Sequence, residues 1–190
     1  MGNEFLYKEY ELNYEQLRFY DSRQESIFLY LFTLTSSVAA AQFAIYKFFS
    51  GATQEFYKCH LFLSAIVFIA TVLLYLAMLQ NRLYFVFTAR QLNAIRRYLL
   101  EKEASEFKDN QLYTSTNFPA IKLSSIHTMQ LIGAVLISSL FASSSVYALL
   151  PSMNQQANLG WSIFSFFIIA TFEIISGFIY LWVWQYYFYI

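Results

Sequence analysis

The sequence is poor in charged residues. Only 13% of its 190 residues are Asp, Glu, Lys or Arg, about half of the ~25% that is typical of a soluble domain. So few charges cannot cover a surface that faces water, and most of the outside of the folded chain must therefore face something else. The formal net charge is zero, which gives no general attraction to nucleic acid.

Cysteine and glycine are also scarce. The single cysteine, Cys59, excludes an intramolecular disulfide and a metal site built from several cysteines. Five glycines are too few for loops that cradle a nucleotide, and the sequence contains no HExxH, GxSxG or P-loop motif. We therefore expect neither an enzyme nor a bound cofactor or metal.

What the chain has instead is four long apolar runs. Almost uncharged, they cover residues 25–50, 57–80, 124–150 and 160–186. Each has the ~20 residues or more that are needed to cross a bilayer. Any one run would also suit a buried helix of a large soluble core, but four in so short a chain leave no amphipathic segments to surround them. The sequence predicts an all-α polytopic membrane protein with four transmembrane helices in contact with the lipid bilayer.

Basic residues indicate the orientation in the membrane. They lie mainly before the first run and between the second and third, whereas the last connection, "PSMNQQANLG", has none. Because loops rich in Lys and Arg stay in the cytoplasm, we expect both termini and the long middle connection to be cytoplasmic.

The cytoplasmic segments next to the first two runs have helical patterns. Residues 1–24 join the first run without a break, since no Gly or Pro occurs from Glu4 to Ser50. In residues 81–106, apolar positions recur on one helical face. We predict two antiparallel helical extensions that form a stalk on the order of 30 Å long, followed by a loop over residues 107–123. The alternative is a pair of amphipathic helices on the lipid headgroups, which the acidic residues of the first segment disfavour.

Glu173 lies at the centre of the last apolar run, in "IIATFEIISGF". An acid at that depth costs roughly 2.5 kcal/mol on insertion scales, so it must face protein or water. At helical spacing it shares a small, polar side with Ala170, Ser176 and Gly177. Three roles remain open: a hydrogen-bonded packing contact, a ring of carboxylates lining a cation path in an oligomer, or a proton relay.

Polar residues in the other runs extend the set of candidates for a pore or a gate, which becomes Glu173, Ser176, Gln42, Ser138 and Ser145. The candidates for contact with a cytosolic protein, or with a nucleotide or nucleic-acid trigger, are Arg90, Arg96 and Arg97, although topology signalling is the commoner role of such residues. No nucleic-acid-binding motif is present. We expect His127 to be a hydrogen-bonding side chain at the membrane interface.

The layout of the first half resembles a known family. An N-terminal segment, "YEQLRFYDSRQE", leads into a close pair of apolar runs, followed by the basic and acidic segment "ARQLNAIRRYLLEKE". This layout, over roughly residues 4–105, resembles small bacterial membrane effectors of the SLATT type. The resemblance implies a protein of the bacterial inner membrane whose membrane part forms a pore that kills or arrests the cell when a partner enzyme signals infection.

Two functions of different classes are compatible with these observations. The leading hypothesis is a homo-oligomeric channel or pore-forming effector, gated through its cytosolic helices, that acts in anti-phage defence by disrupting the membrane. The alternative is a non-conducting membrane anchor that docks a soluble partner on its cytosolic stalk. A proton-coupled transporter would be favoured by internal symmetry, but the two halves of the sequence show no convincing match.

Overall fold

Four long helices make up the fold. The structure, a computed structural model, describes residues 2–103, 119–153, 156 and 159–187. In chain order the helices are α1 (Gly2–Phe48), α2 (Gln54–Glu103), α3 (Ile126–Ser152) and α4 (Leu159–Tyr187). All four are long and apolar enough to cross a membrane, and no strand occurs among the residues that the structure describes. The predicted all-α class with four candidate membrane spans is confirmed, and the chain is an integral membrane protein in contact with lipid.

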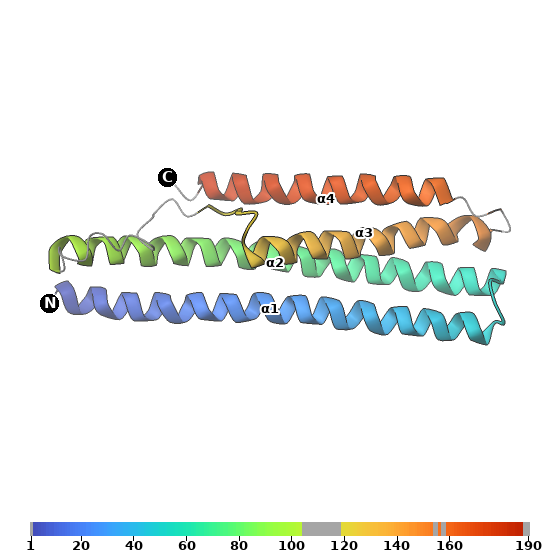
Figure 1. The fold of residues 1–190 in the computed structure, drawn as a ribbon, viewed down its shortest axis with the longest axis horizontal. Coiled ribbons are helices and arrows are strands. Elements are labelled where there is room, and N and C mark those ends of the chain that lie inside the picture. The colour runs from blue at the N-terminus through green and yellow to red at the C-terminus, as the bar shows by residue number, and fades with distance from the viewer. Residues whose placement is uncertain (1, 104–118, 154–155, 157–158, 188–190) are drawn as a thin grey trace.

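Helices α1 and α2 are much longer than a membrane is thick. Their 47 and 50 residues correspond to about 70 and 75 Å at ~1.5 Å per residue, against ~30 Å for the hydrocarbon core. Both extend past the start of α3 and the end of α4 at the same end of the molecule (Figure 1). We call this extension the stalk; it consists of residues 2–24 of α1 and 81–103 of α2.

The turn between α1 and α2 is short because its backbone adopts left-handed conformations. Ser50 has φ 56° and Gly51 has φ 123°, and the Gly51 N–H donates to the Tyr46 carbonyl oxygen at 3.0 Å. A positive φ is strained for most residues but not for glycine. Thr53 then caps α2, since its hydroxyl oxygen accepts from the Phe56 N–H at 3.2 Å. The two longest helices are therefore antiparallel neighbours.

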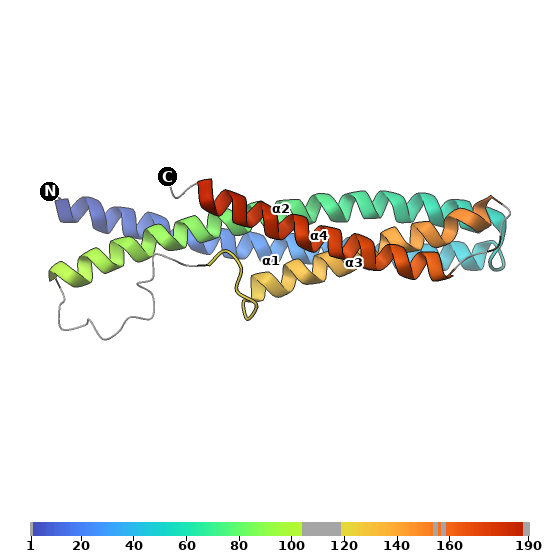
Figure 2. The same ribbon diagram turned by 90° about the horizontal axis from the view of Figure 1, so that it is seen from above.

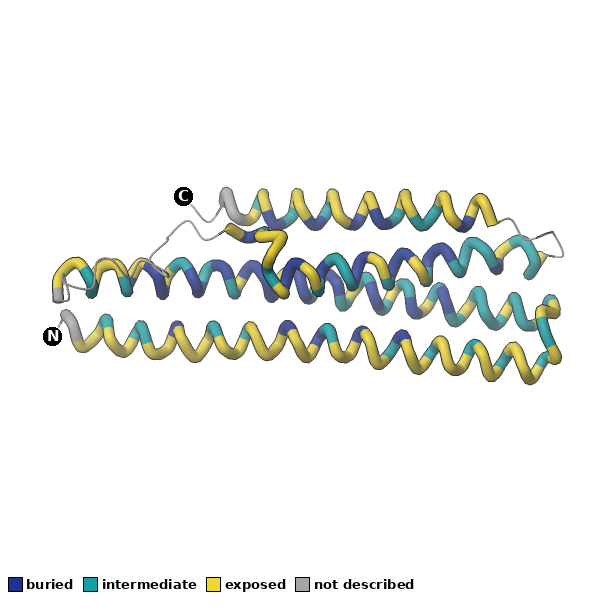
Figure 3. Tube along the Cα trace, viewed as in Figure 1, coloured by how far each residue is buried: buried dark blue, intermediate teal, exposed yellow. Residues whose placement is uncertain are grey.

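The four helices do not form a closed bundle. Helices α2 and α3 are at the centre, α1 packs mainly against α2, and α4 packs mainly against α3; α1 and α4 do not contact each other over the residues that the structure describes. Figures 1 and 2 show α1 and α4 on opposite sides of the central pair. In Figure 3 the buried positions gather on α2 and α3, whereas α1 and α4 are exposed along most of their length.

The segment before α3 has an irregular backbone. The predicted loop at 107–123 lies mostly outside the described residues, which resume at Pro119. Residues 119–125 are not helical, and α3 begins after Ser125, whose extended backbone (φ −84°, ψ 137°) is that of an N-cap residue. Ala120 of this segment is buried against the core. The connection is thereby held against the membrane end of the stalk.

Candidate functional site

Glu173 lies at the middle of α4 and is buried within the chain. Only 6% of the residue is exposed, and its Oε2 accepts a hydrogen bond from the Ser138 hydroxyl of α3 at 2.5 Å. Its second carboxylate oxygen, Oε1, is buried and has no hydrogen-bond partner among the described residues. The carboxylate therefore faces protein, which meets the condition that its depth in the membrane imposes.

The backbone around Glu173 is held by a tyrosine from α2. The Tyr75 hydroxyl donates to the Glu173 carbonyl oxygen at 2.9 Å, and the Ser176 hydroxyl donates to the same oxygen at 3.1 Å. Gly177 makes this approach feasible, because a Cβ at that position would collide with the Tyr75 hydroxyl. Three helices thus meet at the Glu173 level. We call Tyr75, Ser138, Glu173, Ser176 and Gly177 the mid-membrane layer.

A second polar layer lies nearer the α1–α2 turn. Gln42 of α1 donates through Nε2 to the Ser64 hydroxyl at 2.8 Å. The Ser64 hydroxyl in turn donates to the Ser144 hydroxyl oxygen of α3 at 3.5 Å. The same Ser144 oxygen lies 2.7 Å from His60 Nε2. Polar groups in a span stabilise helix association by such hydrogen bonds. This layer connects α1, α2 and α3 but does not include Glu173.

Serines also join α3 to α4 in the half of the molecule nearer the α1–α2 turn. The Ser143 and Ser162 hydroxyls are 2.8 Å apart, and each hydroxyl also donates to the carbonyl oxygen of the other residue, at 2.7 and 2.9 Å. Ser145, by contrast, donates to the Phe141 carbonyl of its own helix at 2.9 Å. Of the five residues predicted for a pore or gate, the structure brings together Glu173, Ser176 and Ser138, and it separates Gln42 and Ser145 from them.

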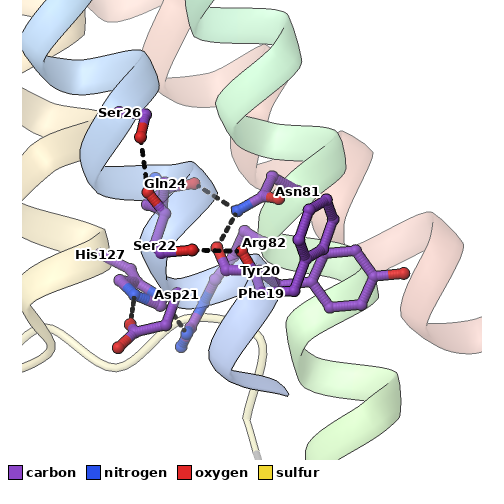
Figure 4. Close-up of polar contacts among 9 residues, drawn as sticks. All are labelled: Phe19, Tyr20, Asp21, Ser22, Gln24, Ser26, Asn81, Arg82 and His127. Carbon is purple, nitrogen blue, oxygen red and sulfur yellow. Dashed lines mark hydrogen bonds and ion pairs between the residues drawn. The ribbon is translucent and has the colours of Figure 1, made fainter. Parts of the chain in front are cut away.

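A third polar cluster lies where the stalk meets the apolar spans (Figure 4). Arg82 of α2 is 1% exposed and His127 of α3 is 3% exposed. Arg82 Nη1 lies 3.0 Å from His127 Nδ1, and His127 Nε2 lies 2.7 Å from Asp21 Oδ1 of α1. A guanidinium has only donors, so Nδ1 must be the acceptor, and the ring proton on Nε2 is donated to the Asp21 carboxylate. The donor and the acceptor of both His127 hydrogen bonds are therefore determined.

The environment of Arg82 suits a buried cation. Its Nε donates to the Ala120 carbonyl at 2.9 Å, and the guanidinium lies 5.3 Å from the centre of the Phe85 ring, a cation–π distance. Burial lowers the pKa of Arg82 to about 10, so the side chain is still protonated at neutral pH. The cluster consequently ties α1, α2, α3 and the segment before α3 together around one charge.

Two amides complete this cluster, which we call the membrane-edge cluster: Asp21, Gln24, Asn81, Arg82 and His127. Asn81 Nδ2 donates to the Tyr20 carbonyl at 2.7 Å and to Gln24 Oε1 at 3.0 Å. Gln24 and Asn81 are 0% and 2% exposed. Buried amides with these bonds are specific contacts, because a shift of α1 along α2 would leave them unpaired.

The arginines predicted as ligand or partner contacts have separate surroundings in the stalk. Arg96 donates to the Tyr10 hydroxyl of α1 through Nε and Nη2, at 3.0 and 2.8 Å. Arg97 is exposed and pairs with Glu101 on its own helix at 3.0 Å. Arg90 is half-buried on the same helix. Arg96 thus joins the two stalk helices, while the ion pair of Arg97 lies within α2.

Sequence reasoning missed the membrane-edge cluster. Arg82 counts there only among the basic residues between the second and third runs. His127 is a hydrogen-bonding side chain at the edge of the spans, as predicted, but the sequence does not show that α1 and α2 bury it. One signal was available: Arg82 follows Thr71, Tyr75 and Met78 at three- and four-residue spacing. That spacing places it on the core face of α2, and all three of those residues are buried.

Comparison with known proteins adds no functional assignment. No family model, curated protein or solved structure matches the chain. Among the described residues, no group of three or more His, Cys, Asp or Glu side chains could hold a metal. The polar layers and the stalk are therefore the observations from which a function can be argued.

Proposed function

We propose that this chain is a membrane-anchored interaction protein whose stalk docks a soluble partner. The observation that carries the proposal is that the stalk is rigidly continuous with the membrane spans. Helices α1 and α2 continue out of the membrane without a break, and the membrane-edge cluster fixes both of them to α3. A stalk held in this way keeps its docking surface at a set height and orientation. By the positive-inside rule the stalk would lie in the cytoplasm, and the resemblance to SLATT-type effectors implies the bacterial inner membrane.

One face of the stalk has the character of a docking surface. Along α1, exposed acidic residues and an exposed tyrosine share one side of the helix, at Glu4, Glu11, Tyr14 and Glu25, with the basic Arg18 among them. Tyr14 is 45% exposed. Acidic groups around an aromatic side chain favour a partner with a basic surface, since complementary charge speeds encounter and an aromatic anchor supplies affinity.

Photo-crosslinking tests this docking role. A photoreactive amino acid in place of Tyr14, in the full chain in its membrane, is expected to form an adduct with one soluble protein. Charge reversal by Glu11→Lys should abolish that adduct, and high salt should weaken it. The same photoreactive group at Phe172, on the exposed face of α4, is the control. Equal adducts at both positions, or an adduct that Glu11→Lys leaves intact, would contradict the proposal.

A second candidate is the homo-oligomeric channel or pore-forming effector. The observation that favours it is the buried Glu173 Oε1, which has no hydrogen-bond partner among the described residues, because a carboxylate oxygen at mid-membrane gains from water or a cation. A trigger that moves the stalk would act on α3 through the membrane-edge cluster. In this role the protein would kill or arrest infected bacteria by disrupting their membrane.

Ion flux from liposomes separates the two candidates. The channel predicts flux with the intact chain and an altered conductance, ion selectivity or toxicity in Glu173→Gln, which keeps the size of the side chain. A chain that is inert in liposomes supports the anchor. If flux is present but all three properties are unchanged in Glu173→Gln, Glu173 has no part in the path.

A further inference from the structure

The middle of the α1 span, residues 33–44, exposes smaller side chains than the neighbouring helices do, although the two ends of the span expose large ones such as Phe32 and Phe48. A helix that faces lipid exposes large apolar side chains, and the other three helices do so, with Phe62 and Ile66 of α2, Leu140 of α3 and Phe172 of α4 between 48% and 70% exposed. Residues 33–44 of α1 do not. Apart from Phe43, every exposed residue in this segment is Ala, Ser or Thr. Small residues in a span mark places where another helix approaches closely.

The stalk part of α1 is more apolar on its surface than a helix in water is expected to be. Beyond the membrane the helix should expose polar side chains, yet Phe5, Leu12 and Phe19 are 64%, 45% and 57% exposed. They are spaced by seven residues, which keeps them on one side of a helix. Contiguous apolar surface in water marks a protein contact. Residues 33–44 of α1 therefore expose less apolar surface than a lipid-facing helix usually does, and the stalk part of α1 exposes more than a helix in water usually does.

One kind of partner satisfies both parts of α1. A soluble protein reaches only the stalk, and lipid reaches only the span. The occupant must have a helix that crosses the membrane and continues about 30 Å beyond it. Helices α1 and α2 of this chain have that shape, so a second copy provides it.

The exposed face of α2 is complementary in size to that of α1. Gln42 bonds to Ser64 at 2.8 Å, and the Tyr46 and Phe56 rings are 5.3 Å apart, so the antiparallel register sets residues 33–44 level with about 60–71. At that level α2 exposes Phe62, Ile66 and Ile69. Large side chains on α2 are therefore level with small ones on α1 of the same chain.

The two stalk helices are also complementary in charge. Residues 2–24 have five acidic and three basic side chains, a net charge of −2, whereas residues 81–103 without the buried Arg82 have four basic and two acidic ones, a net charge of +2. The free face of α2 also bears Tyr84, which is 44% exposed and stacks on Tyr20 at 5.7 Å. It lies away from α3, because Arg82 and Phe85 take the side that contacts His127.

We propose that two copies of the chain pair through this α1–α2 face, with α1 of each copy against α2 of the other. A twofold axis along the membrane normal places residues of the two copies that lie at the same depth next to each other. The large side chains of α2 then meet the small ones of α1, and the acidic segment of α1 meets the basic segment of α2, twice in each dimer. The pairing does not depend on whether the chain docks a partner or conducts ions.

Disulfide trapping between two chains tests the pairing directly. Two differently tagged full-length chains, both carrying Cys59→Ser, are co-expressed in membranes, one with Ser37→Cys and the other with Ile66→Cys. A mixed disulfide is expected, because the two positions are level on facing helices. Ile168→Cys with Phe172→Cys, on the exposed face of α4, is the matched control. No mixed disulfide at 37 and 66, or one no faster than the control, would overturn the proposal.

A substitution on the exposed surface gives an independent measurement. Ser37→Leu gives α1 an ordinary lipid-facing side chain, and Ser37 is exposed, so the fold of one copy is unaffected. Dimerisation measured by energy transfer in liposomes should weaken roughly tenfold, which corresponds to about 1.4 kcal/mol. Leu140→Ile, on the lipid-facing side of α3, should leave it unchanged. Equal dimerisation in all three proteins would contradict the assignment of this face. Neither result depends on the docking or ion-flux assays.

Discussion

A single glycine determines how closely α2 and α4 approach at the mid-membrane layer. Tyr75 is 4% exposed, and its hydroxyl occupies the place where a Cβ of residue 177 would be. The hydroxyl also bonds to the Glu173 carbonyl at 2.9 Å. The glycine therefore determines the position of the helix that carries the buried acid.

Gly177→Ala should destabilise the protein by about 1–3 kcal/mol, because a methyl group must displace a packed side chain and break its hydrogen bond. Thermal unfolding in detergent measures the loss. Adding Tyr75→Phe removes the clashing hydroxyl and should restore part of the stability. A double variant less stable than Gly177→Ala alone would show that the hydroxyl is not the source of the clash.

Arg82 and Arg97 lie on the same helix, but their replacement is expected to lower the stability of the protein by very different amounts. Arg82→Met deprives His127 Nδ1 and the Ala120 carbonyl of a charged donor, and should cost about 2–4 kcal/mol. Arg97→Met removes an exposed pair four residues apart and should cost no more than about 0.5 kcal/mol. Thermal unfolding of both variants in the same detergent makes the comparison. Equal losses would mean that the membrane-edge cluster adds no stability beyond that of a surface pair.

Beyond the membrane-edge cluster, the stalk is an element without the support of α3 and α4 (Figure 1). Its two helices meet through the Asn81–Gln24 amides at the membrane end and through Arg96 and Tyr10 farther out. Since only two helices pack together there, the outer end of the stalk depends on few contacts. Local opening is therefore expected to be easiest at that end.

Tyr10→Phe removes the hydroxyl that accepts from Arg96 but keeps the ring beneath the guanidinium. Losing these bonds should lower the free energy of local opening by about 1 kcal/mol. That corresponds to roughly fivefold faster amide exchange near residues 4–12 and 94–102. Hydrogen exchange with mass spectrometry reports each segment. Tyr14→Phe, at an exposed position without such a bond, is the control. Exchange that rises equally in both variants would contradict the role of Arg96.

The whole molecule is an open row of helices, with α1 and α4 separated by the central pair. A closed four-helix arrangement would bring α1 against α4, and the serine contacts between α3 and α4 would then be one interface among four. In the open arrangement they are a main attachment of α4. Pairs of cysteines within one chain can distinguish these arrangements.

In a Cys59→Ser background, Ser143→Cys with Ser162→Cys should form an intrachain disulfide readily, because the two hydroxyls are 2.8 Å apart. Val38→Cys with Ala170→Cys, which lie at similar depth on α1 and α4, should not. Gel mobility under oxidising conditions shows whether a disulfide forms in each of the two cysteine pairs. A disulfide in the second pair would mean that α1 and α4 are neighbours.

The sequence by itself determined the number, length and class of the helices. Four long and almost uncharged apolar runs are sufficient for that, and the absence of Gly and Pro from Glu4 to Ser50 explains the unbroken α1. Helical spacing also identified the inward face of α4, since Ala170, Glu173 and Gly177 are buried as their periodicity indicates. These properties depend on residues close together in the chain.

Only the tertiary structure decided which residues meet across helices. Arg82 and His127 are 45 positions apart, and His127 and Asp21 are 106 apart, so no local pattern pairs them. Neither could spacing alone choose Ser138 as the partner of Glu173 among several serines of α3, because that choice depends on how far α4 is shifted along α3. The same tertiary packing left the outer face of α1 uncovered within a single chain.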